Sequence, residues 1–250
     1  MSDIMPGHPP MESYLRLIVD HAQEGFVNMA IDEFLLRQAI AKQDPRPLIR
    51  FYEFSKPTMT VGYGLWSKIA PQMKGGIETV RRITGGGIVR HGTDLVYGFI
   101  SPLSLSPALR RPRESYQYIH ETLRSVLNSF GLRTQLYGQT CGCPPTGTSK
   151  NSAKSGSFCF DSPVLFDVML GERKVAGAGQ KRTMGYLLQQ GSIEWSIISE
   201  VEPGLTFSEF IRAFSSALAV GLDLSVKDFS FSAEEMMSLE AVAGRKEEVS

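Results

Sequence analysis

Three consecutive glycines stand beside two arginines in the segment RRITGGGIVRH, residues 81–91. Gly85, Gly86 and Gly87 let the backbone approach a ligand closely, and successive N–H groups can converge there on an anion or a carbonyl oxygen. Arg82 could add a forked contact to a phosphate or an acyl phosphate. A glycine-rich turn with exposed arginines explains the spacing equally well. The segment is neither a P-loop nor a dinucleotide fingerprint, because no Gly-Lys-Ser/Thr follows and the spacing differs.

A lysine opens a second segment of interest, KVAGAGQ, which covers residues 174–180. Small residues follow Lys174, so its ammonium can meet a ligand whose contact with the backbone is unobstructed by side chains. On composition alone, a solvated lysine after the Gly171-Glu172 turn is the better-supported interpretation.

One cysteine, Cys159, lies between two phenylalanines, and a cysteine in such a setting is usually a small buried hydrophobe. It becomes a nucleophile only where a cation lowers its pKa and substrate reaches it. If residues 158–179 form a hairpin, Cys159 and Lys174 can face each other, and the ammonium then favours the thiolate. The sequence does not fix the register of that hairpin.

Overall composition excludes several classes of function. The 250 residues include 26 Lys plus Arg and 26 Asp plus Glu, so the net charge gives no attraction for polyanions and we expect no nucleic-acid partner. No apolar run approaches the roughly 18 residues that cross a bilayer, and residues 1–10 lack a signal pattern, so we expect a cytoplasmic protein without a membrane partner. Three cysteines are too few to staple this chain and are expected to be thiols.

A metal site is not expected. Cys141-Gly142-Cys143 misses the usual two-residue separation of zinc ligands, and the chain has only four histidines. His91, taken alone, is more typical of a hydrogen-bonded structural histidine than of a catalyst.

Periodicity predicts an α+β fold with a mixed, largely antiparallel sheet flanked by helices. We expect a flexible N-terminus over residues 1–12 and a single catalytic domain over 13–250, in which 196–250 form a helical C-terminal extension. The helix that begins near Val27 is expected to carry Asn28, Asp32 and Glu33 as cap or solvated positions. The other predicted elements are a strand pair (48–54 with 58–64), a strand, glycine loop and strand (78–82, 84–87, 95–100), a helix closed by a glycine (116–130), a strand (132–137), a long loop (138–157), hairpin strands (158–170, 173–179, 185–194) and two helices that capping boxes open (207–220, 233–243).

These elements, in this order, resemble the catalytic module shared by lipoate-protein ligases, octanoyltransferases and biotin-protein ligases. RRITGGGIVRH resembles that family's Arg-Arg-x-Ser/Thr-Gly-Gly-x-x-Val-x-His motif, and KVAGAGQ resembles its Lys-Ile/Val-Ala/Ser-Gly-Ser-Ala-Gln motif. Supporting similarity lies in NMAIDEFLL, IRFYEFSKPTMTVGY and YLLQQGSI, so it covers roughly residues 26–195. The resemblance implies the biotin/lipoate ligase-like catalytic fold, with an eight-carbon octanoyl or lipoyl chain beside the glycine loop. The residues that it implies as substrate-binding are Arg82, Thr84, Gly85, Gly86, Gly87, His91, Gly177 and Ala178.

Within the family, CFDSPVLFDVMLGERKVAGAGQ is closest to cysteine-dependent octanoyltransferases that prime the glycine cleavage H protein. This implies that Cys159 takes octanoyl from acyl carrier protein as a thioester, that Lys174 lowers the pKa of Cys159, and that the chain passes to one lysine of a lipoyl carrier domain. Such an acyltransferase requires no cofactor, because the thioester conserves the activation of the acyl group.

Two departures keep an ATP-dependent lipoate-protein ligase open as the alternative. The triple glycine resembles the ligases, and Gly92 stands where an Asp commonly follows the motif histidine, with Asp94 two positions on. A ligase would use ATP and Mg²⁺, would act on free octanoate or lipoate through a lipoyl-adenylate, and would leave Cys159 as a packing residue. About 55 residues follow the resemblance, fewer than an accessory adenylation domain, which favours the transferase or a ligase whose accessory part is a separate chain. A non-catalytic carrier or ligand binder is a third hypothesis, which Cys159 and Lys174 together disfavour.

Overall fold

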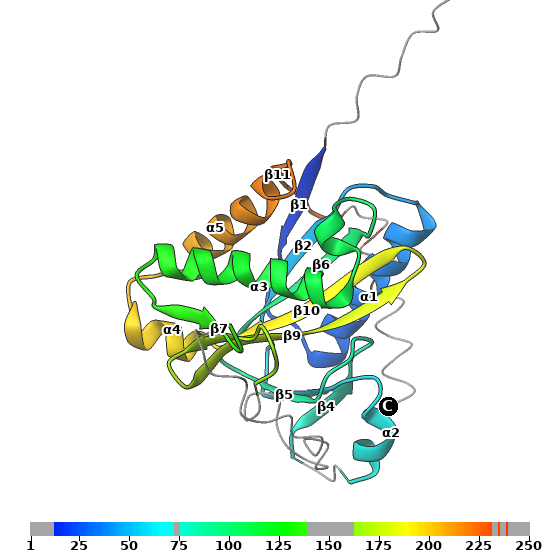
Figure 1. The fold of residues 1–250 in the computed structure, drawn as a ribbon. Helices are drawn as coiled ribbons and strands as arrows, with labels where there is room; N and C mark the ends of the chain where they lie inside the picture. Colours follow the sequence, from blue (N-terminus) through cyan, green and yellow to red (C-terminus); the bar gives the residue numbers. More distant parts are fainter. Residues whose placement is uncertain (1–12, 73–75, 140–162, 232–234, 236–238, 240–250) are drawn as a thin grey trace, which may run out of the picture.

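The computed structural model describes residues 13–72, 76–139, 163–231, 235 and 239, and these form two sheets with flanking helices (Figure 1). Within these residues the larger sheet has eight strands in the order β11-β1-β2-β6-β10-β9-β8-β7, and the smaller has the order β4-β3-β5. The strands of the larger sheet are β1 (Tyr14–Val19), β2 (Leu48–Tyr52), β6 (Leu95–Pro102), β7 (Thr134–Leu136), β8 (Val168–Leu170), β9 (Arg173–Thr183), β10 (Tyr186–Ile193) and β11 (Ser225–Asp228). Those of the smaller sheet are β3 (Thr58–Val61), β4 (Glu78–Arg81) and β5 (Ile88–His91).

Pairing in the larger sheet is mixed. Strand β1 runs parallel to both β2 and β11, whereas the pairs from β2 through β6, β10, β9 and β8 to β7 are antiparallel. The predicted α+β fold with a mixed, largely antiparallel sheet is therefore confirmed.

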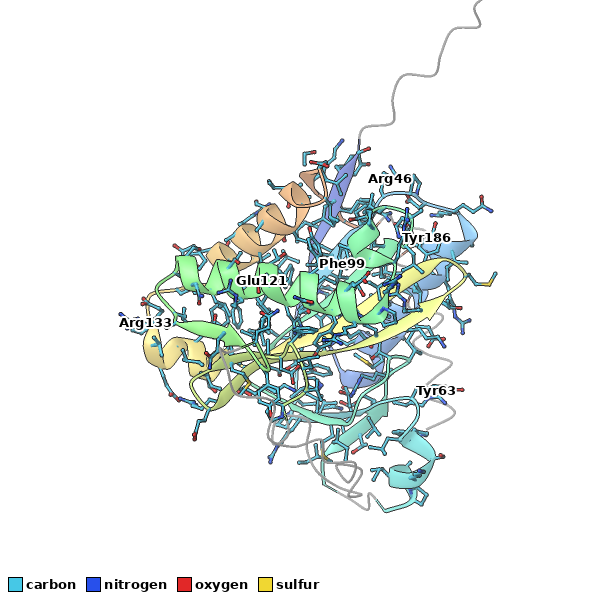
Figure 2. All side chains as sticks on the ribbon, in the orientation of Figure 1. Arg46, Tyr63, Phe99, Glu121, Arg133 and Tyr186 are labelled. Atoms are coloured by element: carbon cyan, nitrogen blue, oxygen red, sulfur yellow. The ribbon has the colours of Figure 1, made fainter. Side chains whose placement is uncertain are left out.

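Helices cover both faces of this sheet and create its core. The helices are α1 (Gly25–Ala41), α2 (Trp66–Ile69), α3 (Pro112–Ser129), α4 (Trp195–Val201) and α5 (Phe207–Val220). On one face α3 and α5 pack on the strands, and Phe214 of α5 meets Phe51 and Tyr97 there edge to face. On the other face α1 packs, with Ile31 against the cluster that contains Leu188. Figure 1 shows α3 in front of β9 and β10, and Figure 2 shows the buried Phe99 near the middle of the molecule.

Local signals explain the helices well. A stripe that includes Ile119, Leu123 and Leu127 buries one face of α3, and Gly131 adopts a φ of 95° just after the helix ends. The helix starts before the predicted residue 116 because Pro112 suits the first helical turn. Helix α5 has the predicted bounds, and both halves of its Thr206–Glu209 capping box are formed.

The predicted pairing of residues 48–54 with 58–64 is wrong. Strand β2 pairs with β1 and β6, whereas β3 pairs with β4 and β5 in the other sheet. All five residues of β2 are buried, so the strand needs neighbours on both sides within the large sheet. The turn at Ser55-Lys56-Pro57 carries the chain from one sheet to the other.

The strand, glycine loop and strand are confirmed as β4, residues 82–87 and β6, with β5 formed by the end of the same motif. The hairpin β9–β10 is also confirmed. The hairpin β8–β9 forms as well, but its first strand is shorter than the predicted 158–170, because the described residues 163–167 precede β8, and Lys174 pairs with Met169. Strands β1 and β11 and helix α4 were not predicted from the sequence. Residues 1–12, 158–162 and all but the first two of the loop 138–157 lie outside the described residues, as does the helix 233–243 except for residues 235 and 239. No helix in the described part of the chain is long and apolar enough to span a bilayer.

Candidate active site

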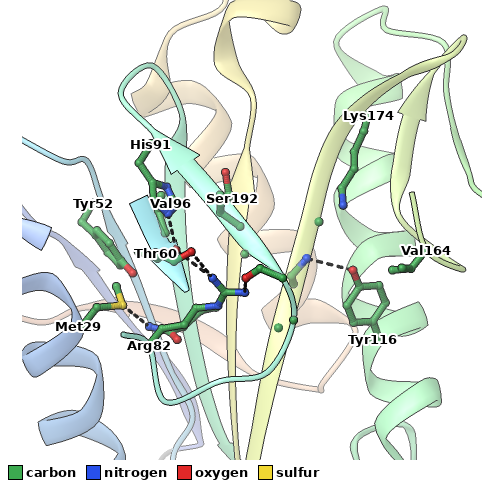
Figure 3. A pocket seen from close by; sticks show the side chains of 18 residues that line it. Met29, Tyr52, Thr60, Arg82, His91, Val96, Tyr116, Val164, Lys174 and Ser192 are labelled. Carbon is green, nitrogen blue, oxygen red and sulfur yellow. Dashed lines mark hydrogen bonds between the residues drawn. The ribbon is translucent and has the colours of Figure 1, made fainter. Parts of the chain in front are cut away.

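A cavity of about 140 Å³ lies between the small sheet, α3 and the strands β9 and β10 (Figure 3). Met29 of α1, Tyr52 of β2 and Val96 of β6 line it too, so most of the lining is apolar or backbone. The predicted residues that line this cavity are Arg82, Gly86, Gly87, His91, Lys174, Gly177 and Ala178. Thr84 is buried behind the loop, and Gly85 faces a neighbouring hollow.

The glycine loop is held in place by Arg82. Its guanidinium donates five hydrogen bonds, to the carbonyl oxygens of Gly85 and Gly87 and to both oxygens of Thr60, at 2.9–3.2 Å. A guanidinium has five N–H donors, so these contacts use all of them. The expectation of a phosphate contact therefore does not fit Arg82 in this arrangement, whereas a bracing role does.

Close backbone contacts explain why glycines surround the loop. A Cβ on Gly62 would collide with the carbonyl of Gly86, and one on Gly179 would collide with the carbonyl of Gly85. Gly86 itself has a φ of 98°, a conformation that favours glycine. The loop is thus clamped between β3 and β9, and its tip remains exposed at Gly86.

A buried polar network connects the loop to α1. Thr84 donates to the Gln190 side chain at 2.8 Å, Gln190 donates to Asp32 at 2.7 Å, and Asp32 accepts from Arg50 at 2.9 Å. Arg50 is fully buried and also donates to Asn28.

The interpretation of Asn28 and Asp32 as cap or solvated positions is wrong, because both side chains are buried. Asp32 compensates the charge of Arg50, and Asn28 accepts a hydrogen bond from the same guanidinium. Glu33, placed with them in that interpretation, forms an ion pair with the exposed Arg37 one turn along α1.

Lys174 is not a solvated residue. Its side chain is only 5% exposed, and Nζ lies 2.8 Å from Oδ2 of the fully buried Asp167. Gly177 makes room for this side chain, since a Cβ there would lie 2.5 Å from Nζ. The second glycine motif therefore has a specific task, which is to admit a buried ammonium to the wall of the cavity.

Asp167 also binds α3 and its own turn. Tyr116 of α3 donates to Oδ1 of Asp167 at 2.5 Å, and its hydroxyl accepts from the N–H of Ala178 at 3.0 Å (Figure 3). Burial, together with the Asp167 carboxylate, raises the pKa of Tyr116 far above its usual value, so the hydroxyl stays protonated and donates. The N–H of Val164 donates to Oδ2 at 2.7 Å. Sequence reasoning missed Asp167 and Tyr116, although an acidic residue directly before a short apolar strand was a usable signal.

His91 has the structural environment that its sequence context suggests. Thr60 bonds its Nε2 at 2.8 Å and Asp94 bonds its Nδ1 at 2.7 Å, while its ring stacks on Phe54 at 4.2 Å. Burial alone would raise the pKa of Asp94, but His91 and Ser192 outweigh burial and hold it below the usual value. Asp94 stands two residues after Gly92, the position at which the family commonly has an Asp, and it holds His91 in place.

The turn before β8 is held by a buried histidine. His120 of α3 bonds the carbonyl oxygen of Phe166 through Nδ1 at 2.8 Å, and its Nε2 is buried without a hydrogen-bond partner among the described residues. Phe166 has a φ of 72°, unusual for a residue with a side chain. This contact supports the strained turn that aims Asp167 at Lys174.

A second hollow of about 350 Å³ adjoins the cavity and shares Gly86, Tyr116, Val164, Ala178 and Gly179 with it. We call it the entry groove. The side chain of Val164 is 55% exposed there.

Cys159, Cys141 and Cys143 lie outside the described residues. Within the described part of the chain, no three His, Cys, Asp or Glu side chains gather as metal ligands.

Comparison with known protein families shows which family the chain belongs to. Residues 24–243 match the lipoyl protein ligase A/B catalytic domain. The chain belongs to this family. The predicted resemblance is thereby confirmed, and with it the prediction of an acyl-transferring enzyme.

Relatives of the catalytic domain cover most of the chain. The octanoyltransferase LipM of Bacillus cereus is 28% identical over 260 residues, 88% of this chain and 91% of the relative. That of Bacillus subtilis is 29% identical over 248 residues, 84% and 86% of the two chains. That of Carboxydothermus hydrogenoformans is 32% identical over 182 residues, 70% of this chain and 63% of the relative.

Solved structures of lipoate-protein ligases share the fold. Lipoate-protein ligase A bound with ATP superposes with a TM-score of 0.66 at 18% identity, over 94% of each chain. A bipartite lipoate protein ligase from Thermoplasma acidophilum, from a study of that ligase and its E2 lipoyl domain, superposes at 0.60 and 17% identity, over 94% of this chain and 91% of that one.

Proposed function

We propose that this acyltransferase moves an octanoyl or lipoyl group from acyl carrier protein to one lysine of a lipoyl carrier domain, such as the glycine cleavage H protein. The observation that carries the proposal is the Lys174 ammonium, which Asp167 fixes at the wall of a largely apolar cavity. A buried cation beside an apolar cavity favours a thiolate over a thiol where the two meet. The similarity to LipM octanoyltransferases supports the same reaction.

The proposed nucleophile is Cys159, which precedes Val164 by five residues. Five residues span at most about 18 Å, so covalent geometry allows the thiol to reach the cavity that Val164 lines. In the first step Sγ of the thiolate bonds to the thioester carbonyl carbon, and the thiolate of the carrier leaves and takes up a proton. In the second step the amine of the acceptor lysine attacks the same carbon, an amide forms, a proton passes to solvent and the Cys159 thiolate is released.

In this proposal each remaining site residue has a positioning task. Lys174 stabilises the Cys159 thiolate and, as it is regenerated, the leaving sulfur. The glycine loop and the strand at Gly177 and Ala178 border the acyl chain, and Arg82 keeps the loop in place from behind.

The hydrogen bonds of Arg82 are also relevant to the ATP-dependent alternative. Every N–H donor of Arg82 bonds to a protein oxygen, so this residue is not a candidate for the phosphates of ATP. We propose that the protein works without ATP or Mg²⁺, because a thioester donor already carries an activated acyl group.

Intact mass spectrometry tests the proposal directly. Incubation with octanoyl-acyl carrier protein is expected to add one octanoyl group to the wild type, and Cys159→Ser should prevent stable thioester labelling. The labelled enzyme should then transfer its octanoyl group to a lipoyl carrier domain in the absence of ATP. An unmodified wild type that modifies a carrier domain only with ATP and free lipoate would establish the ligase instead.

A further inference from the structure

Four cationic side chains lie in or next to the segments that line the entry groove, and we call Arg81, Arg113, Lys181 and Arg182 the cationic rim. Arg113 lines the groove directly, and Arg182 bonds Ser115 and the carbonyl oxygens before α3. Lys181 follows Gln180 of the groove lining, and Arg81 shares with it the ring of Tyr63.

Aromatic rings orient three of these four cations without neutralising their charge. The guanidinium of Arg81 and the ammonium of Lys181 lie 5.4 and 5.6 Å from the ring centre of Tyr63, which is 59% exposed. The backbone N–H of Tyr63 donates to the carbonyl of Thr84, so this aromatic platform is fixed to the glycine loop. Arg113 lies 5.3 Å from the ring of Phe166 in the same way. Cation–π contacts orient a cation and leave its charge uncompensated.

Carboxylates are scarce around the rim. Within the described residues none of the four rim cations forms an ion pair, and the nearest acidic residue in sequence, Glu114, pairs with Arg111. The whole chain has no net charge, so this local excess of positive charge is a property of the groove rather than of the composition. Complementary potentials accelerate and orient the docking of an oppositely charged partner.

We propose that the cationic rim docks an acidic carrier domain that delivers the acyl chain as a thioester, a proposal that rests on the proposed function. The apolar wall of the entry groove, with Val164 and Leu165, suits the passage of a neutral acyl chain from the rim to the cavity. The acceptor, in contrast, presents a lysine, whose cationic form the rim repels. This difference in charge assigns the rim to the donor rather than to the acceptor.

The test separates docking from chemistry with two donors. The double variant Arg81→Glu/Lys181→Glu is compared with the wild type for acylation of Cys159 by octanoyl-acyl carrier protein and by octanoyl-N-acetylcysteamine, a small neutral thioester. We expect kcat/KM for the carrier-bound donor to fall about tenfold or more and to lose its salt dependence. The rate with the small thioester should stay unchanged, as should both rates in Arg133→Glu, whose exposed side chain lies at the opposite side of the molecule from Tyr63 in Figure 2.

Three outcomes would overturn the docking proposal. An equal loss with both donors would indicate a structural defect, and an unchanged rate with the carrier would exclude the rim as its docking surface. A loss confined to transfer from octanoyl-enzyme to the carrier domain would assign the rim to the acceptor. If neither donor acylates the wild type, the proposed function fails, and fluorescence anisotropy with labelled acyl carrier protein still decides the docking. Salt-sensitive binding by the wild type and none by the double variant would support it, and equal binding would refute it.

Discussion

Nζ of Lys174 and Oδ2 of Asp167 lie 2.8 Å apart, and both side chains are almost completely removed from solvent. The two residues belong to different segments, the start of β9 and the turn before β8, so the ion pair joins the site to its supporting turn. A charge in such a place is tolerated only with its partner, since an isolated buried ion is strongly unfavourable.

The first prediction concerns this pair. Lys174→Met and Asp167→Asn should each lower the free energy of unfolding by roughly 3–5 kcal/mol, because each leaves one buried group without its counter-charge. The double variant should lower the free energy of unfolding by clearly less than the sum of the two single losses. Urea unfolding of the three variants and the wild type measures this, and additive losses would show that the two groups are not coupled.

Gly177→Ala is expected to displace the ammonium while the fold persists. A Cβ at this position would lie 2.5 Å from Nζ of Lys174, so the side chain must move away from the cavity. Misplacement by about 1 Å can lower a rate on the order of a hundredfold, and we expect a loss of that size in the acylation of Cys159. Gly64→Ala is the matched control, because a Cβ there meets nothing within 4 Å. Full activity in a folded Gly177→Ala variant would contradict the proposed role of Lys174.

Substitutions of two adjacent acidic residues of α1 should lower the free energy of unfolding by very different amounts. Asp32→Ala leaves the buried Arg50 with one carboxylate fewer and unsatisfied donors, so we expect a loss of about 3–5 kcal/mol in the free energy of unfolding. Glu33→Ala removes a pair with the exposed Arg37, which is worth roughly 0.3–0.5 kcal/mol. Thermal and urea unfolding give both values, and similar effects of the two substitutions would argue against the buried network.

Stability should depend on pH through His120. Burial lowers the pKa of His120 from 6.5 to about 4, so between these values the unfolded chain binds a proton that the folded protein does not. The contribution is complete above pH 6.5 and is lost as the pH falls toward 4, on the order of 3 kcal/mol in all. His120→Asn, which retains a donor near Nδ1, should flatten this part of the stability profile.

Elements with strong local signals were predictable from the sequence. The stripe of α3, the capping box of α5 and the β9–β10 hairpin each depend on residues that are close in the chain, and all three are confirmed. Strand β11 had no such signal, because its four residues pair in parallel with β1, more than 200 residues away. The turn after β2 likewise could not reveal that the next strand joins a different sheet.

The site was predictable only in part, because some of its contacts join residues that are far apart in the sequence. The glycine and lysine motifs indicated which backbone and which cation face the cavity. Asp167 and Tyr116 acquire their roles only when α3 packs over the turn before β8, a contact of long range. Asp32 looked solvated because a polar residue on a helix usually is, and its burial depends on Arg50 from a neighbouring strand.

The parallel pairing of β11 with β1 has a consequence for the order of folding during synthesis. Strand β1 is synthesised before the other described strands, but one side of it stays without a partner until residues 225–228 have been made. While the segment between these two strands is synthesised, β1 therefore presents an open hydrogen-bonding edge, the kind of surface on which nascent chains associate wrongly. The large sheet can be completed only after β11, the last of its described strands, has been made.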